Sequence, residues 1–286
     1  MDILIIQENG RHNANRDFRE CFCIKRALEK FNKKVTVWGL GHDNFYENIN
    51  FNKFDIIINL ENYDATNWIP DLSKTNKPIK FLWCIDAHVK GIESYKYEFY
   101  KNKYHKILQS TYDFLRDIPE SIWLPNAFDN SIIKPLNISK TINLGFCGNH
   151  ATNERKVVLD FLTKNINLKQ DIFVIGQKMV ETINSYKIHF NMNISNDINY
   201  RNFETIGCKT VLCTNKNHQY EKLGFIDMQN CILYSDLNEA IGKIEFLLKT
   251  NNILDDISSR GYQLSFNHTY TERAKTILNE FYVLSI

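Results

Sequence analysis

The chain has 286 residues, of which 43% are hydrophobic and 24% charged, and its formal net charge is +2 at pH 7. This length allows two domains that each bury a core, and the composition is typical of a globular protein. The small net charge gives no electrostatic indication of a nucleic-acid or anionic-membrane partner. Seven scattered cysteines predict a reduced, cytoplasmic protein. We see no targeting segment and no apolar run of about 20 residues, so we expect no membrane insertion.

Predicted strands alternate with helices along the first part of the chain. A helical pattern of apolar residues covers 18–31, and apolar runs predict strands at 2–6, 34–38, 54–59, 79–84, 106–109 and 121–124. This order, with Gly10 in the first turn, is typical of a doubly wound parallel sheet. Gly10 and Arg11 lie in the loop after the first strand, and we expect them to approach a diphosphate or an acceptor.

The pattern restarts after a looser passage that runs from Pro125 to Pro135. Strands are predicted at 141–146, 171–175, 188–192 and 210–213, and helices at 153–162, 236–248 and 252–264. Two successive series of this kind predict an α/β protein with two Rossmann-like domains that face a central cleft.

The stretch Asn199-Tyr-Arg-Asn-Phe-Glu-Thr-Ile-Gly-Cys-Lys-Thr-Val-Leu-Cys-Thr214 predicts the start of a helix, a stop at Gly207 and a buried strand. Arg201 and Glu204 are three residues apart and therefore share one face of the helix. Helix N-termini attract phosphate, arginine binds it, and a carboxylate accepts hydrogen bonds from vicinal hydroxyls. The stretch therefore suits a phosphorylated, ribose-bearing ligand.

This stretch, together with GFIDMQNCILYSDLNEAIGKIEFLL and RGYQLSFNHTYTERAKTIL, resembles the C-terminal half of CgeB-like (spore-maturation-type) glycosyltransferases, which are related to family 4. The chain keeps the family residues Arg201, Phe203, Glu204, His268, Thr269, Tyr270 and Arg273. The resemblance implies the GT-B fold. We expect an acceptor-side domain at 1–135, a nucleotide-sugar-binding domain at 136–268, and a helix at 269–286 that crosses back to the first domain. The His268-Thr-Tyr-x-x-Arg273 motif is interpreted as architectural.

The resemblance implies transfer of a sugar from a nucleotide-diphosphate donor, with a UDP-sugar favoured, to an acceptor hydroxyl with retention of configuration. Glu204 would hold the ribose and Arg201 would neutralise the diphosphate. The departing diphosphate can itself take the acceptor proton, so no protein nucleophile is required. Catalysis would then consist of positioning and charge stabilisation.

Five further residues are candidates for contact with the donor. Gly148 would let the backbone approach a phosphate, and Asn149 would add a polar contact. Asn196 stands where many family members have a glutamate, and either Asn196 or the adjacent Asp197 is expected to bind sugar hydroxyls. Asn199, at the start of the predicted helix, completes this set.

Trp83-Cys-Ile-Asp-Ala-His88 stands at the carboxyl end of a predicted strand, where ligands bind in open α/β sheets. It resembles a D-x-H segment of the family. His88 is predicted to hold a sugar hydroxyl or to stabilise developing charge, and Asp86 to orient it.

The sequence contains no recognisable metal-ligand cluster and no Asp-x-Asp pair of the kind used by metal-dependent glycosyltransferases. We therefore expect no metal, and no cofactor besides the donor substrate. The acceptor and the oligomeric state are not indicated. Three alternatives stay open: a sugar-nucleotide epimerase of the same fold, a glycosyltransferase that acts on modified DNA bases, and a non-catalytic protein that binds a sugar nucleotide or glycan.

Overall fold

The computed structural model describes residues 1–10, 12–62 and 66–286, which form two compact units. Unit 1 contains Met1–Asp129, Ser195–Asp197 and Tyr270–Ile286, and unit 2 contains Asn130–Ile194 and Ile198–Thr269. The sequence analysis places the corresponding divisions at residues 135 and 268, and it assigns residues 195–197 to the second domain. The predicted α/β class, with two parallel sheets, is confirmed.

Unit 1 is built on a six-stranded parallel sheet with the order β2-β1-β3-β4-β5-β6. Its strands are β1 Asp2–Ile6, β2 Lys34–Trp38, β3 Ile56–Leu60, β4 Ile79–Cys84, β5 Lys106–Gln109 and β6 Ser121–Trp123. Every residue of β3 is buried, because side chains cover both faces of this central strand, as parallel sheets require. The parallel register brings the carboxyl ends of β1, β3 and β4 to one edge, where the loops that follow them carry polar residues.

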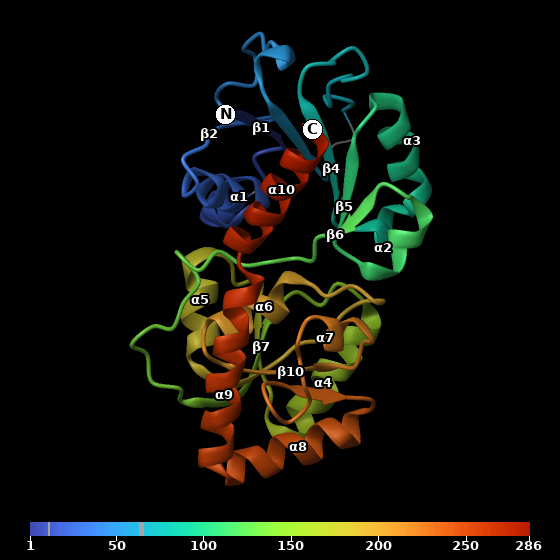
Figure 1. The fold of residues 1–286 in the computed structure, drawn as a ribbon. Coiled ribbons are helices and arrows are strands. Elements are labelled where there is room, and N and C mark those ends of the chain that lie inside the picture. The colour runs from blue at the N-terminus through green and yellow to red at the C-terminus, as the bar shows by residue number, and fades with distance from the viewer. Residues whose placement is uncertain (11, 63–65) are drawn as a thin grey trace. The chain divides into compact units, whose positions relative to one another are not determined.

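The helices of unit 1 are α1 Glu20–Glu29, α2 Ala87–Lys90, α3 Ile92–Asn102 and α10 Tyr270–Leu284, with 3-10 turns η1 Asn13–Phe18, η2 Phe51–Lys53 and η3 Tyr112–Asp117. The last helix, α10, packs against α1, as Figure 1 shows. Arg273 of α10 donates from Nε to the Pro125 carbonyl at 2.7 Å and from Nη2 to the Asn126 carbonyl at 3.0 Å. These hydrogen bonds join the end of the chain to the rest of unit 1.

Unit 2 is built on a five-stranded parallel sheet with the order β11-β10-β9-β7-β8. Its strands are β7 Ile142–Gly148, β8 Lys169–Ile172, β9 Tyr186–Phe190, β10 Val211–Asn215 and β11 Ile232–Tyr234. Its helices are α4 Asn153–Ile166, α5 Gly176–Asn184, α6 Tyr200–Gly207, α7 Gln219–Lys222, α8 Leu237–Lys249 and α9 Asn251–Ser265, and the 3-10 turn η4 covers Phe266–His268. Leu144, Ile188 and Val211 of three neighbouring strands pack with Ile244 and Leu247 of α8 in one core.

Short polar side chains start three of the helices of unit 2. The side chains of Thr152, Asn199 and Asp236 accept backbone N–H groups in the first turns of α4, α6 and α8. Two predicted strands are displaced by two or more residues. β8 covers Lys169–Ile172 instead of 171–175, because Phe173 adopts a left-handed φ of 56° and ends it. β9 covers Tyr186–Phe190 instead of 188–192. Among the described residues, no helix is both long enough and apolar enough to cross a membrane.

Candidate functional site

The carboxyl end of β4 in unit 1 is held by a buried glutamate from the neighbouring strand. Glu61 follows β3, and its Oε2 accepts the backbone N–H groups of Ile85 at 3.0 Å and Asp86 at 2.6 Å. Lys90, at the end of α2, lies 3.2 Å from the other oxygen of this carboxylate, whose side chain is only 1% exposed. Glu61 thus holds the backbone just before α2 through two adjacent N–H groups, and it contacts the Lys90 side chain at the end of that helix. Asp86, the N-cap of α2, and His88, within α2, are positioned by this arrangement.

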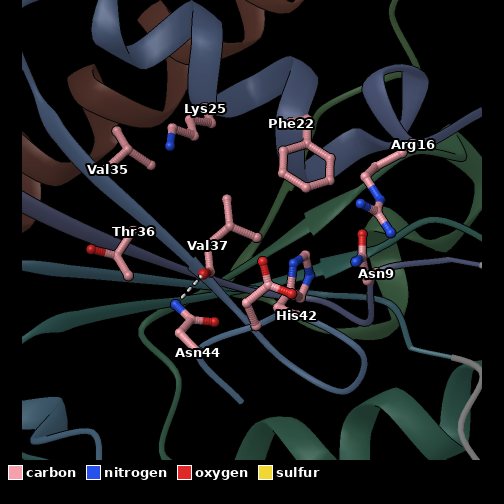
Figure 2. A pocket seen from close by; sticks show the side chains of 10 residues that line it. Asn9, Arg16, Phe22, Lys25, Val35, Thr36, Val37, His42 and Asn44 are labelled. Carbon is pink, nitrogen blue, oxygen red and sulfur yellow. Dashed lines mark hydrogen bonds between the residues drawn. The ribbon is translucent and has the colours of Figure 1, made fainter. Parts of the chain in front are cut away.

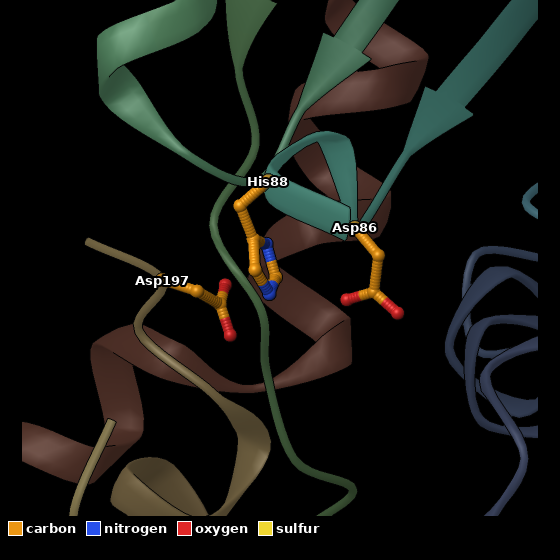
Figure 3. Close-up of side chains that lie close together, drawn as sticks. All are labelled: Asp86, His88 and Asp197. Carbon is orange, nitrogen blue, oxygen red and sulfur yellow. The ribbon is translucent and has the colours of Figure 1, made fainter. Parts of the chain in front are cut away.

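Asp86 and His88 lie beside Asp197, as Figure 3 shows. One ligand atom from each of the three side chains lies within 4.8 Å of those of the other two. Asp197 belongs to the Ser195–Asp197 segment of unit 1, and Asn196 of the same segment donates to Asp113 Oδ2 at 2.8 Å. Unit 1 thus contains Asp86 and His88, two of the three residues that the sequence predicts to be catalytic, together with Asn196 and Asp197, which it predicts for the donor sugar. The third predicted catalytic residue, Arg201, belongs to unit 2.

Burial shifts the pKa of each of the three side chains toward its neutral form. Burial raises the pKa of Asp86 to about 7, and the nearby Glu61 and Glu20 add to the rise. Burial raises the pKa of Asp197 to about 8, with further contributions from Asp86 and Glu61. Burial lowers the pKa of His88. Such a cluster can hold a proton, donate and accept hydrogen bonds with hydroxyl groups, or bind a cation.

The loop after β1 is also tied into unit 1. The side chain of Gln7 accepts the backbone N–H of Cys21 at 3.0 Å and donates to Glu20 Oε2 at 3.0 Å. Arg19 and Glu8 form an ion pair at 2.9 Å. Gly10 has a φ of +78°, which a side chain rarely adopts, so the turn itself accounts for this glycine. The predicted site residue Arg11 lies outside the described residues.

A pocket of about 560 Å³ lies along the edge strand β2 of unit 1 (Figure 2). Its wall contains the cationic side chains of Arg16 and Lys25, the ring of Phe22, and Asn44, which donates to the Val37 carbonyl at 3.0 Å. Of the predicted site residues that the structure describes, none lines this pocket.

In unit 2, a network of asparagine side chains surrounds the start of α6. Asn202 is fully buried and donates to Asn193 Oδ1 at 2.8 Å, while its own oxygen accepts from Tyr220 at 2.7 Å and from Asn191 at 3.2 Å. Asn199 caps the helix by accepting the backbone N–H of Arg201 at 3.0 Å. The sequence analysis identifies the cap at Asn199 but not the network, whose only signal is the repetition of asparagine in 191–202.

The structure brings together the two residues that carry the nucleotide prediction. Arg201 Nη1 lies 2.5 Å from Glu204 Oε2, and the Glu204 side chain is 12% exposed. The same guanidinium contacts the sulfur of Met179 in α5. Behind this pair, His189 accepts the Cys147 N–H at 3.1 Å and bonds Thr205 Oγ1 at 2.6 Å. Burial and the charge of Arg201 lower the pKa of His189 well below its usual value, so this ring is neutral and structural.

Gly148 and Asn149 stand at the carboxyl end of β7, next to a buried arginine. Arg155 of α4 is 8% exposed and donates to the carbonyl oxygens of Asn149 at 3.2 Å and Met192 at 2.5 Å. Its Nε is buried without a hydrogen-bond partner, and no ion pair joins it to a carboxylate in residues 1–10, 12–62 and 66–286. Burial lowers the pKa of this guanidinium. An anion at this edge of the sheet would supply the missing charge partner.

The His268-to-Arg273 motif has structural contacts. His268 bonds the Leu223 carbonyl at 2.8 Å, and its ring centroid lies 5.0 Å from that of Phe203. The Tyr270 N–H donates to the Phe128 carbonyl at 3.0 Å. These contacts agree with the architectural interpretation of the motif.

A family model described as "Glycosyl transferase-like" matches residues 131–279, which is just over half of the chain. The chain belongs to this family. The matched residues include the Arg201–Glu204 pair, Gly148, Asn149 and the asparagine network, so the family match rests mainly on unit 2.

Solved structures resemble this glycosyl transferase-like chain over nearly its whole length. A glycosyltransferase from Rickettsia africae ESF-5 has 11% identity and a TM-score of 0.69, with 98% of this chain and 97% of that chain covered. Anabaena HepE in complex with UDP has 9% identity and a TM-score of 0.67, with 100% of both chains covered. T4 phage β-glucosyltransferase has 12% identity and a TM-score of 0.67, with 97% and 98% covered. At these identities the likeness shows the fold, and it confirms the predicted GT-B class.

Two curated relatives align over shorter stretches. The ATP synthase gamma chain of Mycoplasma capricolum is 29% identical over 116 residues, which are 40% of this chain and 40% of the relative. The gamma chain of Mycoplasma mycoides is 34% identical over 92 residues, which are 32% and 31% of the two chains. The chain spans less than half the length of these curated relatives, and we base no function on them.

Proposed function

We propose that the chain is a glycosyltransferase that moves a sugar from a nucleotide-diphosphate donor, with a UDP-sugar favoured, to an acceptor hydroxyl. The observation that carries this proposal is the family match over the segment that holds the Arg201–Glu204 pair at the start of α6. HepE has been solved with UDP and with UDP-glucose, which supports the choice of UDP. The closer relation to CgeB-like enzymes is part of the proposal.

The donor would bind to unit 2. Glu204 would accept hydrogen bonds from the ribose hydroxyls, and the capped N-terminus of α6 at Asn199 would face the diphosphate. Arg201 and Arg155 would supply positive charge, and Arg155 has a buried Nε that a phosphate oxygen could satisfy. Gly148 would let the backbone approach the phosphates, with Asn149 beside it.

The transfer would retain the anomeric configuration and need no metal on the diphosphate. The leaving diphosphate would take the acceptor proton as the new glycosidic bond forms, so the chain has to position the reactants and stabilise charge. His88, Asp86, Asn196 and Asp197, together in unit 1, would hold sugar or acceptor hydroxyls. Gly10 and Arg11 stay predictions for the acceptor or the diphosphate. No cofactor besides the donor is proposed.

Calorimetric titration with UDP, ADP and GDP in the presence of EDTA tests the donor site. We expect UDP to bind, and radiolabelled UDP-glucose to be hydrolysed slowly without an acceptor. Absence of binding to every nucleoside diphosphate would contradict the proposal. Binding without turnover for any donor and acceptor would favour the non-catalytic sugar-nucleotide-binding alternative. The anomeric signals of the product in a proton NMR spectrum would decide between retention and inversion.

Modified DNA is a second candidate acceptor. The T4 phage β-glucosyltransferase and an α-glucosyltransferase solved with UDP and a 13-mer DNA that contains an HMU base both have this fold, each with a TM-score of 0.67. Incubation with radiolabelled UDP-glucose and a duplex that carries hydroxymethylated pyrimidines tests this candidate. Labelled duplex would establish it, and an unmodified duplex of the same sequence is the control.

A further inference from the structure

We propose that Asp86, His88 and Asp197 bind one divalent transition-metal ion, of the Zn²⁺ or Mn²⁺ kind, in unit 1. This proposal differs from the sequence analysis, which predicts that the chain binds no metal. It contains unit 1 residues only, whereas the donor residues Arg201 and Glu204 belong to unit 2. A metal-binding site in unit 1 is therefore compatible with a diphosphate that binds without metal.

The three ligand atoms are close to the spacing that a metal requires. They lie within 4.8 Å of one another, and Figure 3 shows the carboxylates of Asp86 and Asp197 on opposite sides of the His88 ring. Atoms that coordinate Zn²⁺ at about 2.1 Å in a tetrahedron lie about 3.4 Å apart. Side-chain rotations that shorten the longest separation by about 1.4 Å would close the site, and the backbone need not move far.

The second observation is a buried carboxylate oxygen without a partner. Asp197 is 7% exposed, and its Oδ1 has no hydrogen-bond partner. His88 Nδ1 is also buried without a partner. A buried acceptor costs about 1–3 kcal/mol when nothing bonds it, and more when it carries charge. Both atoms are ligand types for a cation, and both belong to the same cluster.

The charge around the cluster also favours a cation. Asp86, Asp197 and Glu61 place three carboxyl groups near one another, and Lys90 is the cation that lies against Glu61. Glu61 accepts the N–H groups of Ile85 and Asp86, so it orients the ligand-bearing turn without having to bind the metal itself. Second-shell groups of this kind commonly position metal ligands.

The ligand types select the class of ion. An imidazole nitrogen favours Zn²⁺ and other transition metals over Mg²⁺ and Ca²⁺, while two carboxylates are also compatible with Mn²⁺. Three protein ligands leave at least one coordination position open, as in catalytic zinc sites. If the proposed transfer holds, an acceptor hydroxyl could occupy that position.

Metal binding can be measured directly on the full chain. The protein is dialysed against EDTA, freed of chelator, and titrated calorimetrically with Zn²⁺ and with Mn²⁺, and Co²⁺ is added separately for its visible absorption spectrum. We expect one equivalent to bind. Asp197→Asn, which keeps the side-chain shape, and His88→Gln, which removes the imidazole but keeps a polar side chain, should each weaken binding at least tenfold. Asp255→Asn and His12→Gln, which change exposed residues outside the cluster, should bind like the unchanged chain.

The outcomes separate a metal site from other uses of the cluster. No binding by the folded, unchanged chain would overturn the proposal and leave a proton-sharing cluster. Equal binding by Asp197→Asn and His88→Gln would also overturn it, because the ion would then be elsewhere. Circular dichroism checks that both variants are folded, and UDP titration in EDTA tests the donor site independently. Failure of metal binding can thus be distinguished from failure of the proposed function.

Discussion

The polar groups at the end of β4 in unit 1 and those at the start of α6 in unit 2 differ in how completely they are hydrogen bonded. Asn191, Asn193 and Asn202 in unit 2 are buried, and among the described residues none of them has a buried side-chain atom without a partner. In unit 1, His88 Nδ1 and Asp197 Oδ1 are buried and unbonded. The unit 2 region is therefore preorganised by its own side chains, whereas the unit 1 region lacks partners that a ligand could supply.

The largest expected effect is on the stability of unit 2. Asn202→Leu keeps the size of the side chain but removes both its donor and its acceptor, leaving the partner atoms on Asn193 and Tyr220 without it. We expect the free energy of unfolding to fall by about 3 kcal/mol, since the buried hydrogen bonds of Asn202 with Asn193, Tyr220 and Asn191 are lost and each contributes about 1 kcal/mol. Urea unfolding followed by circular dichroism measures this change.

The chain offers a spectroscopic control for that experiment. Its four tryptophans, Trp38, Trp68, Trp83 and Trp123, all belong to unit 1, so tryptophan fluorescence follows the unfolding of unit 1. Asn165→Ala, at an exposed position on α4, should change stability by less than about 0.5 kcal/mol. If Asn202→Leu lowers the free energy of unfolding no more than Asn165→Ala does, the asparagine network does not stabilise unit 2 through these hydrogen bonds.

The next effect concerns the ligand that the preorganised region would bind. Glu204→Gln keeps the shape of the side chain and removes its charge, so hydrogen bonds from ribose hydroxyls should weaken. Hydrogen bonds to charged groups contribute about 1.5–3 kcal/mol, and we therefore expect UDP affinity to fall about tenfold or more. Calorimetric titration measures the affinity, with Glu181→Gln on the exposed face of α5 as the matched control. Equal affinity of the two variants would exclude Glu204 from the nucleotide site.

Local patterns in the sequence predict the fold and much of the unit 2 site. Short apolar runs predict the strands of both sheets, and Asn199, Arg201 and Glu204 are close enough in the sequence for helix geometry to bring them together. The bounds of β8 cannot be predicted in this way, since the left-handed conformation of Phe173 has no local signal comparable to a glycine.

Long-range contacts are not predictable from such patterns. Asp197 and His88 are 109 positions apart, and nothing in the spacing of either residue indicates that they share a cluster. Glu61 follows a predicted strand, but its role depends on the neighbouring strand β4, whose next two N–H groups it accepts. Sequence analysis therefore identifies Asp86 and His88 by their place at a strand end. It names Asp197 only as a candidate for the donor sugar, and it does not place Asp197 or Glu61 beside the other two.

A smaller effect should distinguish the two regions by pH. In the metal-free chain the folded pKa values of Asp86 and Asp197, about 7 and about 8, lie above the usual value of 3.8. The folded chain then binds protons that the unfolded chain has lost, so the stability of unit 1 should fall as the pH rises from about 4 to about 8. The lowered pKa of His189 has the opposite sign, and unit 2 should lose stability as the pH falls below 6.5.

Asp86→Asn should reduce the loss in unit 1 between pH 5 and pH 8 by about 1 kcal/mol, after allowance for partial exposure to solvent. Urea unfolding followed by tryptophan fluorescence at each pH measures the effect. The same pH dependence in Asp86→Asn and the unchanged chain would mean that this carboxyl is not held at a raised pKa.

The smallest expected change in stability is that of Gly148→Ala, which tests whether a phosphate binds close to the backbone in unit 2. Gly145→Ala in the same strand serves as the comparison. A Cβ at Gly145 would overlap the ring of Tyr186, so Gly145→Ala should cost about 1–3 kcal/mol through overpacking. A Cβ at Gly148 would contact the edge of the Phe146 ring, with Cζ nearest at 3.1 Å, so Gly148→Ala should cost less than about 1 kcal/mol. If the backbone at Gly148 approaches a diphosphate, this mild substitution should still lower UDP affinity severalfold, because the added methyl group keeps the phosphate away. Unchanged UDP affinity in a stable Gly148→Ala variant would show that this glycine serves the turn alone.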